Sequence, residues 1–163
     1  MNKQDYAYIK QSRQLILEQC KDLTEAEFTQ VHGFALNSVK DTLIHMTKCY
    51  RNWVGSYLLG NSKVGDYPVE EVAKMTLADI EKLFALVDSY VYEAIEKYED
   101  AMDTLMDSTS AFKADAQIQR TPHHILLHAF THEFHHKGQV TAMFHLMGHK
   151  PRNTNMIEFE SIS

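Results

Sequence analysis

Two histidines share one face of a helix predicted over residues 121–148. His132 and His136 are four residues apart, so their side chains lie one above the other. Their stripe also holds the apolar residues Ile125, Ala129, Val140, Met143 and Met147. A buried neutral imidazole needs partners for both ring nitrogens. A metal ion meets that need by taking one nitrogen from each ring while the other nitrogen donates to a nearby acceptor. The spacing therefore predicts two metal ligands.

A third candidate ligand, His45, lies on a different predicted helix, which begins near Asn37 or Ser38 and ends at Gly60. His45 shares a stripe at helical spacing with Thr42, Cys49 and Trp53. Catalytic zinc sites commonly use three protein ligands and keep a position open, and bundle sites draw their ligands from facing helices. We therefore predict a metal site made of His45, His132 and His136.

The same segment contains a competing motif. His132, Glu133 and His136 spell HExxH, the zinc-peptidase signature in which the glutamate activates water. A peptidase of this kind needs a downstream third ligand, for which Glu158 and Glu160 are the available choices. The longer form of the motif is absent, and no strand is evident to hold an extended substrate. This interpretation is the less favoured one.

Other residues near these positions have weaker assignments. His128 lies one turn before the histidine pair and is a candidate for an alternative ligand or for a supporting hydrogen bond. Cys49 suits a small buried apolar position better than a thiolate ligand. Tyr50, Trp53 and Gln139 are candidates for the mouth of a substrate pocket. No general base can be assigned from the sequence.

The composition excludes several classes of protein. A chain of 163 residues suits one domain, here residues 1–163, and a net charge of −6 argues against nucleic-acid binding. No apolar run approaches the roughly 20 residues that a membrane-spanning helix requires. The N-terminus lacks the apolar core of a signal peptide, and Cys20 and Cys49 form no CxxC pair, so we expect a cytoplasmic protein. Eight of the ten histidines fall between His123 and His149.

The elements that must position these histidines are predicted to be helices. Hydrophobic periodicity predicts four long helices, over residues 4–23, 38–60, 77–98 and 121–148, and a helical turn at 24–28. Thr121 can cap the last helix, with Pro122 at its first position, and Gly148 ends it. The segments 61–68 and 99–120 read as connections. The expected fold is all-α, a four-helix bundle with long crossover connections.

Two segments resemble a known family. DTLIHMTKCYRNWVG around His45 and HEFHHKGQVTAMFHLMG from His132 onward resemble the DinB-like (DinB/YfiT) superfamily of small four-helix-bundle metalloproteins. The resemblance implies the ligands His45, His132 and His136, a divalent metal ion, commonly nickel or zinc, and a homodimer. Members of that superfamily include metal-dependent transferases and isomerases that activate thiols such as bacillithiol or mycothiol, and others resemble hydrolases.

The expected function is therefore that of a divalent-metal-dependent enzyme with a three-histidine site. Its expected reaction transfers a low-molecular-weight thiol of the bacillithiol type to a small electrophile. Two alternatives remain open at the level of sequence: a metal-dependent hydrolase, and a stress-associated metal-binding bundle with no enzymatic activity. The expected partner is a small-molecule substrate, with neither nucleic acid nor membrane involved.

Overall fold

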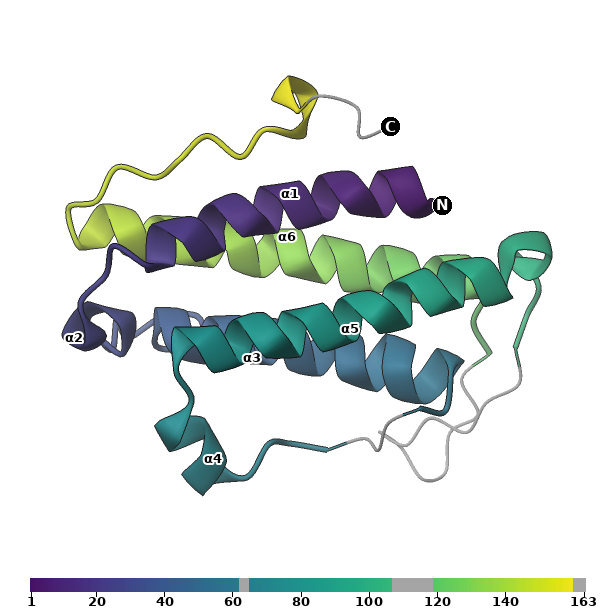
Figure 1. The fold of residues 1–163 in the computed structure, drawn as a ribbon, viewed down its shortest axis with the longest axis horizontal. Helices are drawn as coiled ribbons and strands as arrows, with labels where there is room; N and C mark the ends of the chain where they lie inside the picture. The colour runs from purple at the N-terminus through teal and green to yellow at the C-terminus, as the bar shows by residue number, and fades with distance from the viewer. Residues whose placement is uncertain (62–64, 107–118, 160–163) are drawn as a thin grey trace.

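Four long helices form a bundle in the computed structural model, which describes residues 1–61, 65–106 and 119–159 (Figure 1). They are α1 (Lys3–Cys20), α3 (Val39–Tyr50), α5 (Leu77–Lys97) and α6 (Pro122–Leu146). A π-helix, η1 (Arg51–Leu58), continues α3, and the short helices are α2 (Glu25–Phe28), α4 (Val69–Lys74), η2 (Glu99–Ala101) and η3 (Met156–Glu158). No strand occurs in the three described ranges. The predicted all-α bundle is confirmed.

The four long helices pack in a closed ring. Both α1 and α3 contact α5 and α6. Figure 1 shows α1 and α6 running in one direction and α3 and α5 in the other. Because α3 and α5 are parallel, the chain must return along the bundle between them, and it does so through the segment that carries α4. The antiparallel contact between α3 and α6 brings the two histidine-bearing helices face to face.

Local sequence sets the ends of the helices. The side chains of Ser38 and Thr121 accept hydrogen bonds from backbone N–H groups in the first turns of α3 and α6, which have no partner within the helix. Pro122 occupies the first turn of α6, where its missing N–H costs nothing. After α6 the chain turns at Gly148, whose φ of 84° favours glycine.

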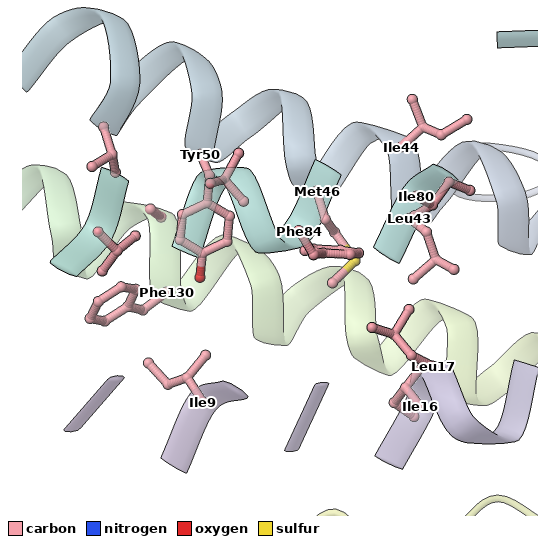
Figure 2. Packing of buried hydrophobic residues seen from close by; sticks show 14 of the residues in the cluster. Ile9, Ile16, Leu17, Leu43, Ile44, Met46, Tyr50, Ile80, Phe84 and Phe130 are labelled. Carbon is pink, nitrogen blue, oxygen red and sulfur yellow. The ribbon is translucent and has the colours of Figure 1, made fainter. Parts of the chain in front are cut away.

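The core is built from apolar side chains that all four long helices contribute (Figure 2). Ile16 from α1, Leu43 from α3, Phe84 from α5 and Phe130 from α6 are each at most 3% exposed. Burying a side chain of this size contributes about 1.5–3 kcal/mol. In the described residues, no helix combines the length and apolar character that crossing a membrane would require.

The structure differs from the sequence prediction in two helical segments. The helix predicted over 38–60 changes from α to π geometry at Arg51, and the amide of Leu59 bonds to the carbonyl of Val54 at 3.1 Å. Helix α4 was not predicted, because its six residues are too short for a clear hydrophobic period. Short π-helical segments are rare and occur often at functional sites, and this one follows the helix that carries His45.

Candidate metal centre

The three predicted histidines meet between α3 and α6. The Nε2 atom of His132 lies 3.2 Å from Nε2 of His45 and 3.3 Å from Nε2 of His136. One candidate ligand atom from each ring can be chosen so that all three lie within 4.8 Å of one another. Two bonds of about 2.0–2.1 Å at a tetrahedral zinc ion would separate their nitrogens by about 3.3 Å. The spacing of the rings is therefore compatible with one divalent ion.

The environment keeps these imidazoles neutral. Burial, together with the neighbouring His136, lowers the pKa of His45 to about 4 and that of His132 to about 3. Burial also lowers the pKa of His136, which is 6% exposed. Metal binding requires the neutral form, because a protonated ring has no lone pair to donate. Each ring can therefore present a lone pair at neutral pH.

Gln139 orients one of the rings. Its Oε1 lies 2.6 Å from Nδ1 of His136, so the amide accepts the Nδ1–H and leaves the lone pair of Nε2 directed at the other two rings. The amide nitrogen of Gln139 contacts Nε2 of His135 at 3.0 Å. Within the described part of the chain, Nδ1 of His132 is buried without a hydrogen-bond partner. The polar contacts of that ring are therefore those of its Nε2, at the centre of the cluster.

Glu133 does not face this cluster. It is 2% exposed, its Oε2 accepts a 2.5 Å hydrogen bond from the Tyr50 hydroxyl, and Nη1 of Arg13 lies 3.6 Å from the same oxygen. This geometry does not fit the zinc-peptidase interpretation of HExxH, in which the glutamate must reach a metal-activated water. Of the proposed third ligands, Glu158 is hydrogen-bonded to Asn153, and Glu160 lies outside the described residues.

Arg13 belongs to a buried charged network that the sequence analysis missed. Its Nη2 lies 2.5 Å from Oδ1 of Asp88, which also accepts a 2.6 Å hydrogen bond from the Tyr6 hydroxyl. Burial raises the pKa of Glu133, while the nearby charge of Arg13 acts to lower it. Tyr6 and Arg13 lie seven residues apart on one face of α1, but an arginine on a helix is ordinarily solvated, so this spacing alone does not indicate the network.

Two hollows flank the histidine cluster. One, of about 490 Å³, is lined by His45 and by residues of α3, of α4 and of the loops that precede those two helices. Its wall includes Ala35 and Asn37, whose φ angles of 52° and 74° are left-handed. The other, of about 250 Å³, is lined by Trp53, Arg120, His124, Ile125 and His128.

The weaker sequence assignments have mixed outcomes. Tyr50 is fully buried against Glu133, so its prediction at a pocket mouth is wrong. Trp53 does line a hollow. His128 stands beside the cluster, with its ring centroid 5.7 Å from that of His132, but is not one of the three grouped donors. Burial raises the pKa of the Cys49 thiol to about 12, which agrees with a small buried residue and not with a thiolate ligand.

The comparison with protein families gives a match that covers the whole chain. The profile of the DinB family matches residues 1–163. A search of curated proteins finds no significant match. The matched chain folds as an all-α bundle, in which a histidine on α3 faces a histidine pair on α6. The chain belongs to the DinB family.

Proposed function

We propose that this protein is a divalent-metal-dependent enzyme that transfers a low-molecular-weight thiol to a small electrophile, with His45, His132 and His136 as the metal ligands. The observation that carries the proposal is the convergence of three neutral imidazoles, whose nitrogens are close enough to one another to bind one shared ion. A divalent ion held there would supply the Lewis acidity that lowers the pKa of a thiol and makes it a nucleophile near neutral pH.

The position of Glu133 favours a thiol over water as the nucleophile. Among the described residues, the group of possible metal ligands consists of the three histidines and contains no carboxylate. Glu133, the carboxylate closest in sequence, is engaged with Tyr50 and Arg13. Three neutral ligands also add no negative charge, so the full charge of the ion remains available to stabilise an anionic nucleophile. A thiol, with an ordinary pKa of about 8.5, needs less help to ionise than water does.

The hollow beside His45 suits a small electrophile. Its volume of about 490 Å³ falls within the usual range for ligand pockets. Much of its wall is apolar, formed by Leu36, Ile44, Tyr67, Val69 and Val72. Lys48 and Asp66 form an ion pair in the same wall. Left-handed backbone at residues other than glycine costs free energy and clusters at functional sites, and Ala35 and Asn37 both show it here.

Metal analysis followed by a thiol-transfer assay tests the proposal. The protein is purified without added metal, analysed for bound metal, and assayed with several low-molecular-weight thiols and an aromatic halide whose substitution is followed by absorbance. We expect metal-dependent transfer that is lost in His45→Ala, while His145→Ala, on the same helix as the histidine pair but outside the cluster, retains it. Hydrolysis of activated esters without thiol transfer would instead support the hydrolase alternative and overturn the proposal.

A further inference from the structure

The smaller hollow beside the centre is basic, although the chain as a whole is acidic. The described residues that line it include Arg120, His124 and His128 and no carboxylate, in a protein of net charge −6. Trp53 and Ile125 provide its apolar wall. A volume of about 250 Å³ has room for a small charged group and part of the molecule that carries it. The lining therefore matches an anion with an organic body.

Neighbouring aromatic rings connect the lining of this hollow to the metal centre. The ring centroid of His128 lies 5.7 Å from that of His132 and 5.3 Å from that of Trp53. Trp53 belongs to η1, the π-helix that follows the helix carrying His45. At a rise of about 1.5 Å per residue, His128 and His124 lie about 6 Å and 12 Å along α6 from His132. A molecule reacting at the centre could therefore reach the hollow with a group one to two helical turns away.

Arg120 gives the hollow its permanent positive charge. Its backbone carbonyl accepts a 3.0 Å hydrogen bond from the amide of Met106, which anchors the residue at the start of α6. Its Nη1 donates to the carbonyl of Gln119 at 2.7 Å, a neutral partner that leaves the guanidinium charge uncompensated by that contact. A guanidinium binds carboxylates and phosphates through paired hydrogen bonds. The imidazoles of His124 and His128 can add further N–H donors.

We propose that Arg120, His124 and His128, with Trp53 as a wall, form an oxyanion subsite for a carboxylate or phosphate carried by the thiol that reacts at the three-histidine centre. The proposal rests on the proposed function for the identity of that substrate. It assigns the thiol to the side of Trp53 and leaves the larger hollow beside His45 for the electrophile. The sulfur and the anionic group of such a thiol lie about 6–12 Å apart, as set by the rise of α6.

Trp53 allows this subsite to be tested directly, because it is the only tryptophan of the chain. Metal-free protein is titrated with S-methylglutathione, with its diethyl ester and with inorganic phosphate, while the tryptophan fluorescence is recorded. We expect saturable quenching by the free acid or by phosphate, and none by the ester. The two anionic probes distinguish a carboxylate from a phosphate as the favoured group.

The matched variants are Arg120→Gln and His123→Gln. Arg120→Gln should weaken binding of the anionic probe about tenfold or more, since hydrogen bonds to a charged group are strong. His123 is close in sequence but does not line the hollow and pairs with Asp103, so its replacement should leave the titration unchanged. Equal quenching by acid and ester, no quenching by either anion, or unaltered binding in Arg120→Gln would overturn the subsite.

This test is independent of turnover. The blocked thiol and the metal-free protein remove the reaction, so anion binding with no transferase activity would support the subsite while refuting the proposed function. Conversely, active transferase whose KM for an acidic thiol is unchanged by Arg120→Gln would refute the subsite alone. Arg120→Gln should leave the affinity for zinc unchanged, because its side chain is not among the three donors.

Discussion

Helices α3 and α6 contribute residues to two polar centres, which satisfy their polar atoms in opposite ways. In the network around Arg13, Glu133 and Asp88 form ion pairs with the guanidinium, and the network is almost fully buried. In the histidine cluster, three neutral rings turn their Nε2 atoms toward one another, and two of the rings are partly exposed. The first centre pairs opposite charges without a ligand. The second directs nitrogen lone pairs at one another unless a cation or protons lie between them.

The difference separates a stabilising network from a binding site. His132 and Glu133 are adjacent in sequence, yet they serve different centres because they point to different sides of α6. A helix that is fixed on one side by Glu133 can hold His132 and His136 in place on the other. Variants of the charged network should therefore change the free energy of unfolding, whereas variants of the histidine cluster should change metal binding.

The largest expected effect is on the charged network. Glu133→Ala leaves Arg13 buried with one of its two countercharges removed and should lower the free energy of unfolding by about 3–5 kcal/mol. Urea denaturation of the metal-free protein measures this change. Lys3→Ala, which breaks the exposed pair with Glu96, is the control and should move the midpoint little. A Glu133→Ala protein as stable as the parent would show that the network carries no such role.

The histidine centre should respond to metal instead. Zinc at 100 times its Kd should raise the free energy of unfolding by about 2.7 kcal/mol, because it binds the folded state alone. His45→Ala should abolish that gain, yet change the stability of the metal-free protein by no more than about 1 kcal/mol. Thermal unfolding with and without zinc measures both effects. A large loss of stability in metal-free His45→Ala would make the centre structural.

The histidine centre was predictable because its signals are local. Spacing of four residues places His132 and His136 on one face, and the stripe containing His45 indicates an inward position before any contact is known. The ends of α6 were predictable for the same reason, since Thr121, Pro122 and Gly148 act on their immediate neighbours.

The charged network and the π-helix were not predictable in this way. An arginine on α1 looks like a solvated residue, and its burial depends on carboxylates from α5 and α6. Val39, Leu43, Met46 and Tyr50 recur at helical spacing, and all four are buried as that spacing indicates. The spacing does not reveal that the Tyr50 hydroxyl donates to Glu133 in the interior instead of lining a pocket mouth. The change to π geometry at Arg51 leaves no signal in the residue spacing, which predicts one continuous helix to Gly60.

A smaller effect is expected from the residue that orients His136. Gln139→Ala removes the acceptor of the Nδ1–H and should weaken zinc binding about 10–100-fold, as loss of such a supporting hydrogen bond typically does. Competition with a chromophoric chelator measures the affinity. Gln14→Ala, which removes an exposed amide bonded to Glu18, is the control. If both variants bind zinc like the parent, Gln139 does not position the ring.

The smallest expected effect is at Cys49. Its thiol stays protonated, because burial raises its pKa to about 12, and it lies outside the grouped donors. Cys49→Ala should therefore leave zinc affinity within about twofold of the parent, a difference well below 1.4 kcal/mol. The same chelator competition measures it. A tenfold loss of affinity would place sulfur in the coordination of the metal.

X-ray absorption at the metal edge of the zinc-loaded protein tests the three-histidine centre most directly. We expect one equivalent of zinc per chain, with three imidazole nitrogens at about 2.0–2.1 Å and an oxygen donor such as water completing the shell. The spectrum of His45→Ala, loaded at a zinc concentration raised to match its weaker affinity, should lose one imidazole. A shell containing sulfur at about 2.3 Å, or a wild-type spectrum that His45→Ala leaves unchanged, would contradict the account.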